Sequence, residues 1–492
     1  MRKRETWATK IGLILAAAGN AIGLGNILRF PSKVALYGGG AFMVPYFISL
    51  FLLGLPLMIL EWVIGRYAGS KGHGSMVGIM GVFFNQNSLP RIIGSLGVSI
   101  PFLIVCYYIY IESWTLGFAF LSLFKKLPQS VEYTDPNLAL IPFLKFYKEY
   151  TQPSLSAIFF LLITLVLNWY VLKRGVVKGI EFTAKIGLPL LFLMGIFLSI
   201  VSLSINNWKG IEGLYFIFKP DFSKLTDPQV WVEASGQIFF TLSLAMGAIA
   251  TYASYVKKNE DVVKIGIYTA LLNELAEIGI GASIAIPAAF AIFGASSIPQ
   301  LAQEGTFRLG FMSMPAILAI LPFGYIFSFI WFFLLFIAAF TSSLALIQPL
   351  VAFFEDELEI SHHLAVNLSI VMVAFGAFLS AFVPGFLDEL DFWAGAVFLI
   401  LFAFIEILVF VWLFGVDNFY KELIRDTFLK IPKLLVYVFY GTSLIFIGIL
   451  FYFWILMKLP QHFQNITWNI IVAKSFIIVT FFILGLLAIK SK

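Results

Sequence analysis

Three glycines and two asparagines lie at the centre of a hydrophobic run, Trp7 to Val34, that is long enough to cross a bilayer as a helix. The stretch reads Gly19-Asn20-Ala21-Ile22-Gly23-Leu24-Gly25-Asn26 and precedes Arg29. Each glycine costs about 1 kcal/mol of helix propensity in water. A broken helix at membrane depth is tolerated only where its backbone lines a cavity or meets a ligand. Small-xxx-small packing of Gly19 and Gly23 is the alternative, but the asparagines favour an ion and substrate site.

More polar residues lie within two later hydrophobic runs. These residues are Gln237, Thr241 and Ser243, just before Ala245-Met246-Gly247, and then Asn273, Glu274 and Glu277. Sodium is a hard cation that takes oxygen ligands from carbonyls, hydroxyls and amides. Asn26, Thr241 and Asn273 can supply side-chain oxygens, and Ala21 can supply a carbonyl freed by the break. A carboxylate in mid-span is costly and therefore a functional candidate, which draws attention to Glu277.

The composition is that of a polytopic membrane protein. The chain has 492 residues, 60% of them hydrophobic and 12% charged, and its mean hydropathy is +0.95, which excludes a soluble globular protein. The basic N-terminus leads into a long span without a cleavage site. Lys and Arg are more frequent in the loops that we assign to the cytoplasm. We expect a multi-pass protein of the plasma (inner) membrane with cytoplasmic N- and C-termini. Cys106, the one cysteine, excludes a disulfide within the chain.

The hydropathy pattern predicts twelve spans. Their ranges are 8–34, 40–67, 91–124, 154–172, 179–203, 230–256, 262–292, 324–354, 362–382, 388–414, 432–457 and 468–489. Interruptions in the first and sixth spans predict two five-span halves of opposite orientation, because an odd number of spans inverts the second half. The first repeat is then 1–203, the second repeat with outer loop helices is 204–414, and 415–492 holds two peripheral spans. This is the pattern of secondary transporters, in which the substrate site lies at the interface between the two repeats.

Several motifs resemble those of the neurotransmitter:sodium symporters, most closely the bacterial leucine-transporter type. They are Trp7-Ala8-Thr9, Gly19-Asn20-Ala21 through Arg29-Phe30-Pro31, Gly38-Gly39-Gly40-Ala41-Phe42, Gly236-Gln237-Ile238-Phe239-Phe240-Thr241-Leu242-Ser243 and Asp391-Phe392-Trp393-Ala394-Gly395. The resemblance runs collinearly from residue 4 to the last span and weakens at 126–153 and in the last two spans. It implies an all-α LeuT-type 5+5 inverted repeat, with spans one and six unwound at mid-membrane, and sodium-coupled symport by alternating access.

The resemblance also assigns roles to residues. The substrate site would comprise Asn20, Ala21, Leu24, Gly25, Ile104, Tyr108, Phe240, Thr241, Ser243, Met246, Ser342 and Leu346. One sodium site would use Ala21, Asn26, Thr241 and Asn273 together with the substrate carboxylate. A second sodium site would use Gly19, Ile22, Ala338, Thr341 and Ser342. Arg29 and Asp391 would form the outer gate. The inner gate would comprise Arg4, Trp7, Ser254, Tyr255, Gln348 and Asp356.

The predicted pocket carries no charge and is narrow, which implies a neutral substrate. Met246 and Ile104 stand where the leucine-transporter type has phenylalanine and valine, and Ala245 replaces a glycine in the unwound segment. Methionine is flexible and can repack around different ligands, whereas Ile104 and Ala245 remove space. We expect a small, aliphatic amino acid and expect tryptophan to be disfavoured.

Other charged residues carry separate expectations. Family members that need chloride have a small hydroxyl residue in place of Glu277, near the counterparts of Tyr46, Gln237 and Thr241, so we expect chloride independence. Glu61 should bond to the unwound backbone of span six. Lys33 should make the outer vestibule more positive. Glu355 and Glu357, within an acidic run, are expected to be solvated, and Glu112 and Glu406 receive no role.

The sequence contains no strong motif for an enzyme or for a metal or nucleotide site. His73, His362, His363 and His462 fall in loops or at span ends, and no metal spacing, Walker loop or Gly-x-Ser-x-Gly motif is present. We therefore expect no enzyme, no organic cofactor and no nucleic-acid partner. The expected partners are an amino acid, two sodium ions and lipid, with a homodimer left open. The alternatives are a proton-coupled or exchange transporter on the same scaffold, or an amino-acid sensor that does not transport.

Overall fold

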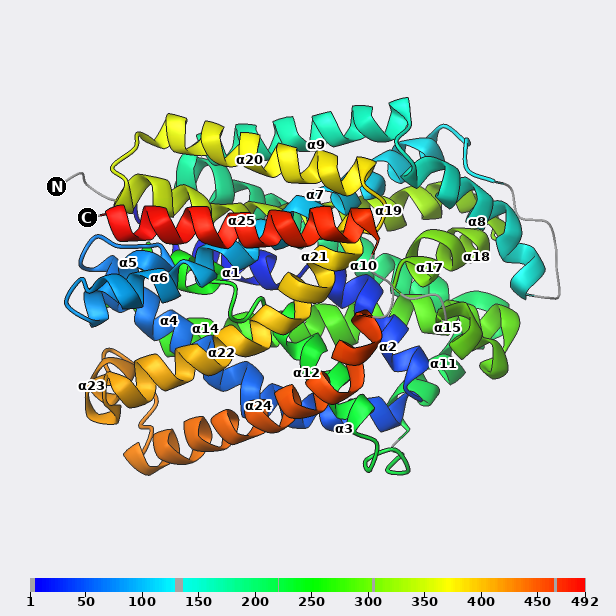
Figure 1. Ribbon diagram of the computed structural model, residues 1–492. Helices are drawn as coiled ribbons and strands as arrows, with labels where there is room; N and C mark the ends of the chain where they lie inside the picture. Colours follow the sequence, from blue (N-terminus) through cyan, green and yellow to red (C-terminus); the bar gives the residue numbers. More distant parts are fainter. Residues whose placement is uncertain (1–4, 129–135, 220, 303–305, 464–466, 492) are drawn as a thin grey trace.

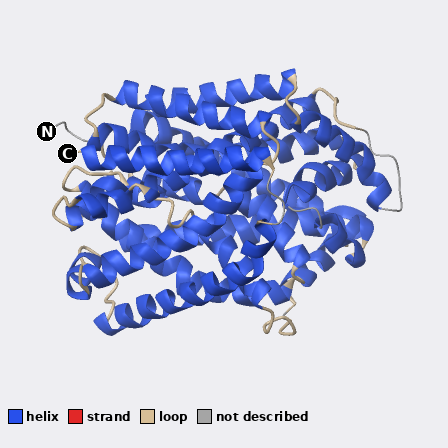
Figure 2. Cartoon of the chain, viewed as in Figure 1, coloured by secondary structure: helices blue, strands red, loops and turns tan. Residues whose placement is uncertain are grey.

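The computed structural model describes residues 5–128, 136–219, 221–302, 306–463 and 467–491 (Figure 1). Every regular element in these ranges is helical, and short loops join the helices (Figure 2). The expected all-α fold is confirmed. Both ends of the described chain lie at the same end of the helix bundle (Figure 1).

In chain order the helices are α1 (Lys10–Ala21), α2 (Phe30–Leu36), α3 (Gly40–Ser49), α4 (Leu55–Gly69), α5 (Met76–Phe83), α6 (Ser88–Gly94), α7 (Leu96–Leu123), α8 (Pro136–Thr151), α9 (Leu155–Lys173), α10 (Phe182–Trp208), α11 (Gly210–Phe218), α12 (Pro228–Thr241), α13 (Ala248–Ser254), α14 (Val262–Glu274), α15 (Ala282–Phe293), α16 (Ile298–Ala302), α17 (Thr306–Arg308), α18 (Met314–Ile320), α19 (Gly324–Ala352), α20 (His362–Phe382), α21 (Phe386–Phe392), α22 (Phe398–Ile407), α23 (Val416–Leu423), α24 (Lys433–His462) and α25 (Trp468–Lys490). Short π-helical segments, among them Gly25–Arg29, Leu50–Gly54 and Leu275–Gly281, join several of them.

Ten helical segments of the described chain are long and apolar enough to cross a membrane, which makes this a multi-pass membrane protein. An eleventh span results if Lys10–Ala21 and Gly25–Leu36, which are bent by 50° relative to each other, count as one. The predicted sixth span corresponds to α12 and α13, each too short to cross alone. The sequence-based total of twelve thus counts both interrupted helices as spans.

The interruptions have local causes. Thr9 caps the start of α1 by accepting a hydrogen bond from the amide of Gly12, and α1 ends at Ala21. Helical structure resumes at Gly25, and the amide of Gly23 between them donates to Asn26 Oδ1 at 2.8 Å. The side chain of Asn26 thus replaces a helical hydrogen bond that the break removes.

The second interruption, residues 242–247, has left-handed backbone at three positions. The φ angles are 53° at Ser243, 57° at Ala245 and 66° at Gly247, although only the last is a glycine. Non-glycine residues adopt this conformation at a cost when surrounding contacts maintain it. Glu61 supplies one such contact, because its Oε1 accepts a hydrogen bond from the amide of Ala245 at 2.7 Å. This is the contact expected from the sequence.

Several helix contacts fix the surroundings of the broken segments. The long helices α7 and α19 pack along each other, and α1 packs against α10, α14 and α19. On α4, a Cβ at Gly65 would lie 2.2 Å from the carbonyl oxygen of Ala250, and one at Gly69 would lie 2.1 Å from that of Ser254. Only glycine permits this backbone approach between α4 and α13. The last two helices, α24 and α25, lie at the periphery (Figure 1).

Candidate functional site

A small cavity lies where the two interrupted helices meet. Its lining residues are Asn20, Ala21, Gly23, Gly25, Asn26, Ile104, Tyr108, Phe240, Thr241, Ser243, Met246, Ser342 and Leu346. All the predicted substrate residues are among them except Leu24. Leu24 instead lines a neighbouring cavity with Arg29 and Asp391. The chain therefore brings residues from four distant segments around one space.

Backbone groups at the first break are hydrogen-bonded to side chains that line this cavity. The amide of Leu24 donates to Tyr108 Oη at 3.1 Å, and Ser243 Oγ donates to the carbonyl of Asn20 at 2.9 Å. Gly23 permits a close approach, because a Cβ there would lie 2.8 Å from both Ser342 Oγ and Tyr108 Oη. One side of the site thus presents amide donors at the start of a half-helix, an arrangement that favours a carboxylate.

The predicted first ion site is a compact group of amide and hydroxyl side chains. Asn26 Nδ2 donates to Thr241 Oγ1 at 2.8 Å and to Asn273 Oδ1 at 2.8 Å. Thr241 Oγ1 lies 3.3 Å from Asn273 Oδ1. Ala21 lines the adjoining cavity together with Asn26 and Thr241. These neutral oxygen atoms are the ligand type that a sodium ion prefers, so the residues present fit the ion.

The predicted second ion site lies between the first break and α19. Ser342 Oγ donates to the carbonyls of Gly19 at 3.1 Å and Ile22 at 3.2 Å. Thr341 Oγ1 lies 3.2 Å from the carbonyl of Ala338. Thr341 and the neighbouring Ser343 bond back onto their own helix, as hydroxyls in a span commonly do. Ser342 is the hydroxyl that reaches across to the broken span.

Glu277 is hydrogen-bonded directly to residues of the predicted first ion site. Its carboxylate is fully buried and accepts hydrogen bonds from Gln237 Nε2 at 2.8 Å, Asn26 Nδ2 at 3.0 Å and the hydroxyl of Thr241. It lies in the π-helical segment Leu275–Gly281, and π-helical turns are frequent at functional sites. Tyr46, expected beside Glu277, is close to it and donates a hydrogen bond to the neighbouring Glu274 Oε2 at 2.8 Å. The carboxyl group of Glu277 is thus hydrogen-bonded to two of the predicted ion ligands.

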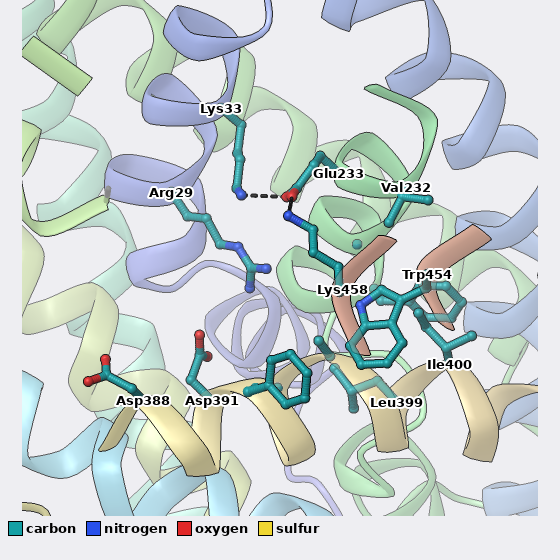
Figure 3. Close-up of a pocket in the computed structure, with 15 residues that line it drawn as sticks. Arg29, Lys33, Val232, Glu233, Asp388, Asp391, Leu399, Ile400, Trp454 and Lys458 are labelled. Atoms are coloured by element: carbon teal, nitrogen blue, oxygen red, sulfur yellow. Dashed lines mark hydrogen bonds and ion pairs between the residues drawn. The ribbon is translucent and has the colours of Figure 1, made fainter. Parts of the chain in front are cut away.

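The predicted outer gate pair lines an outer cavity without a direct ion pair between the described side chains (Figure 3). The guanidinium of Arg29 lies 4.7 Å from the ring centroid of Phe240, and Asp391 Oδ1 accepts a hydrogen bond from Tyr107 Oη at 2.7 Å. The expectation for Lys33 was wrong in part. Its ammonium pairs with Glu233, so its charge is balanced rather than free in the vestibule.

Several predicted inner-gate residues contact one another. Trp7 Nε1 donates to the carbonyl of Tyr252 at 3.0 Å, its amide donates to the carbonyl of Tyr255 at 3.2 Å, and Gln348 Nε2 donates to Tyr255 Oη at 2.9 Å. Ser254 Oγ donates to the carbonyl of Thr251. Asp356 lies in the π-helical segment Phe353–Glu357, which follows α19 in the chain. The predicted partner Arg4 lies outside the described residues.

Two buried carboxylates were missed or misjudged from the sequence. Glu181 accepts hydrogen bonds from the amides of Ala8 and Thr9, at 2.8 and 3.2 Å, and so attaches the start of span one to the π-helical segment Val176–Glu181 that precedes α10. The expectation that Glu357 is solvated was wrong. Its side chain is fully buried and pairs with Arg91 at 3.0 Å and with His73 Nδ1 at 2.9 Å. A carboxylate within or next to an apolar run is the signal that could have identified both.

Comparisons with known proteins identify the family of this chain. A model of the sodium:neurotransmitter symporter family matches residues 4–138 and 148–491. An uncharacterised sodium-dependent transporter of Methanocaldococcus jannaschii is 31% identical over 85% of this chain and 83% of its own length. The sodium- and chloride-dependent GABA transporter 2 of Rattus norvegicus is 26% identical over 86% of this chain and 75% of its own. The crystal structure of MhsT in complex with L-phenylalanine has a TM-score of 0.77 and 31% identity, and covers 92% of this chain and 99% of that chain. The chain therefore belongs to the sodium:neurotransmitter symporter family, a family of sodium-dependent transporters and not of enzymes.

Proposed function

We propose that this transporter carries small, neutral, aliphatic amino acids together with sodium, by alternating access and without a need for chloride. The observation that carries the proposal is the cavity between the two breaks, because none of its lining residues is charged. A zwitterion fits such a site through the backbone. Its carboxylate would meet the amides near Leu24 and Gly25 together with Tyr108. Its ammonium would meet the carbonyl of Ala21 and carbonyls near Phe240, Thr241 and Ser243.

The apolar part of the cavity favours a short side chain. Ile104, Met246 and Leu346 line it, whereas Ala245, which we expected to narrow it, is not among its lining residues. The similar protein MhsT has been crystallised with L-phenylalanine, so an aromatic substrate is the nearest competitor within the amino acids. Met246 can repack around different ligands. We nevertheless place leucine and alanine above tryptophan, because the cavity is small.

Two sodium ions fit the two groups of oxygen atoms. At the first site, the carboxylate of the substrate would complete the shell made by Ala21, Asn26, Thr241 and Asn273, and this shared group would couple the two binding events. The second site would hold its ion between the broken span and α19. Two ions that move down a tenfold gradient at 100 mV supply about 7 kcal/mol, enough for roughly 10⁵-fold accumulation.

The remaining parts of the proposal concern the transport cycle. Glu277 would supply the negative charge that chloride supplies elsewhere, which supports chloride independence. Arg29 with Asp391 would close the outer side, and Trp7 with Tyr255 and Gln348 the inner side. The substrate would bind at the interface between the two halves, 1–203 and 204–414. In the plasma membrane, both ends of the chain would face the cytoplasm.

The test is uptake of labelled leucine, alanine and tryptophan into proteoliposomes, with sodium gradients compared against choline and potassium. We expect sodium-driven accumulation that is the same in chloride and in gluconate, with tryptophan last. Thr341→Ala should reduce the uptake, whereas Thr442→Ala should not, because Thr442 is exposed and bonds only to its own helix. Uptake driven equally well without sodium would establish a proton-coupled or exchange transporter instead. Binding without accumulation would establish a sensor.

A further inference from the structure

Glu233 lies between two lysines from other spans (Figure 3). Its Oε2 pairs with Lys33 Nζ, and its Oε1 pairs with Lys458 Nζ at 2.9 Å. The Glu233 side chain is only 10% exposed, whereas those of Lys33 and Lys458 are 18% and 31% exposed. We call these three residues the outer ion triad. It is thus a largely buried network and not a solvated surface pair.

The outer ion triad joins three elements that are far apart in the chain. Lys33 lies on α2, in the outer half of the first interrupted span, and Glu233 lies on α12, in the outer half of the second. Lys458 lies on α24, a peripheral span outside both repeats. All three line the same cavity as Arg29 and Asp391. The triad therefore connects both broken spans with a helix that the repeats do not include.

The ion pairs of the outer ion triad should differ in energy from exposed ion pairs at a protein surface. Exposed ion pairs contribute little, because water and salt screen them. Here a buried carboxylate has a cationic partner on each oxygen, and the removal of either partner leaves charge that burial penalises. The apolar alternative is that packing alone holds α24, since Trp454 lies 5.1 Å from Phe392 between ring centroids. The two explanations predict different effects of charge-neutralising variants.

We propose that Glu233, held by Lys33 and Lys458, is a positioning residue of the outer gate, and that α24 takes part in this gate through Lys458. The inference rests on the proposed alternating access. By tying α2 and α12 together and to α24, the triad stabilises the arrangement in which these half-helices cover the cavity. When the outer side opens, at least one of the two ion pairs must lengthen.

The experiment measures access to the pathway from outside. Ile111 is 4% exposed and lines a cavity together with Arg29 and Asp391, so Ile111→Cys in a Cys106→Ala background reports opening through its rate of reaction with a charged thiol reagent. We expect Glu233→Gln to raise this rate about tenfold and Lys458→Gln about threefold. In the Glu233→Gln background, Lys458→Gln should add nothing, because the two residues act through one contact. Lys433→Gln is the matched control, since Lys433 pairs with Asp417 at the other end of α24, and should not change the rate.

Two outcomes would overturn the inference. One is a labelling rate in Glu233→Gln and Lys458→Gln equal to that of the parent, in protein with the same size-exclusion profile. The other is an increase in labelling rate on adding Lys458→Gln to Glu233→Gln that is as large as the increase caused by Lys458→Gln alone. Such an increase would show that Lys458 acts through packing and not through Glu233. Sodium-driven uptake by the unsubstituted protein is measured in parallel. Its absence would refute the proposed function, whereas intact uptake with unchanged labelling rates would refute the outer ion triad alone.

Discussion

Replacement of Glu277 by serine should convert this protein into a chloride-dependent transporter. The carboxylate of Glu277 accepts hydrogen bonds from Gln237 and Asn26, at 2.8 and 3.0 Å, and from Thr241. Two of these donors are also proposed sodium ligands. Serine removes the negative charge and leaves a space lined by donors, which is the environment that a chloride ion requires.

The magnitude follows from the charge. An ion held by Asn26 and Thr241 would lie about 5 Å from the carboxylate, and two opposite unit charges at that distance attract by about 3 kcal/mol at an effective dielectric constant of 20. The loss of this attraction should weaken apparent sodium affinity about a hundredfold in chloride-free medium. A chloride ion in the vacated space should restore most of it.

The assay is sodium-driven uptake into proteoliposomes, with chloride replaced by gluconate. Glu277→Ser should be active only in chloride, and Glu277→Gln should be weak in both media, because its amide fills the space without a charge. Glu274→Gln is the matched control. Glu274 is the neighbouring carboxylate, it accepts from Tyr46, and its loss should create no chloride requirement. Undiminished uptake by Glu277→Ser in gluconate would refute the charge argument.

Three further predictions concern the sodium site, the substrate site and the attachment of span one. Ser342→Ala should raise the sodium concentration for half-maximal uptake about tenfold, since it removes one oxygen ligand, and an unchanged sodium titration would exclude Ser342 as a ligand. Tyr108→Phe should raise the substrate KM about tenfold with a smaller change in maximal rate, and equal KM values would contradict carboxylate recognition by its hydroxyl. Gly12→Ala should destabilise the protein by about 1–3 kcal/mol, because a Cβ there would lie 2.1 Å from Glu181 Oε1; an unchanged Tm in detergent would show that this contact relaxes freely.

The interruptions were predictable because their cause is local. Glycine and asparagine inside an apolar run do not form a stable span, so the residue types alone locate the breaks near Gly23 and Gly247. The same reasoning identified Glu277 and Glu61, since a mid-span carboxylate needs partners. Hydropathy alone also predicted the span ranges to within a few residues.

The long-range ion pairs could not be predicted in this way. Glu357 lies in an acidic run that looks solvated, and its partner Arg91 is distant in the sequence, so only the packing of the inner loops buries the pair. Lys33 appeared as an added positive charge because nothing near it in the chain indicates Glu233. Sequence periodicity reports which face of a helix is apolar, but not which charged residue of another helix meets it.

The glycines on α4 have a mechanical consequence. Because the backbones of Gly65 and Gly69 lie directly against the carbonyls of Ala250 and Ser254, α4 and α13 cannot slide past each other without steric overlap. A displacement of α13 about the unwound segment 242–247 would therefore carry α4 with it. The π-helical segment Leu50–Gly54 directly precedes α4 and is the nearest point at which α4 can bend relative to α3, the other half of its span. The rigid body that moves on the inner side would then combine α4 from the first repeat with α13 from the second. A single methyl group added at Gly65 or Gly69 would push these two helices apart.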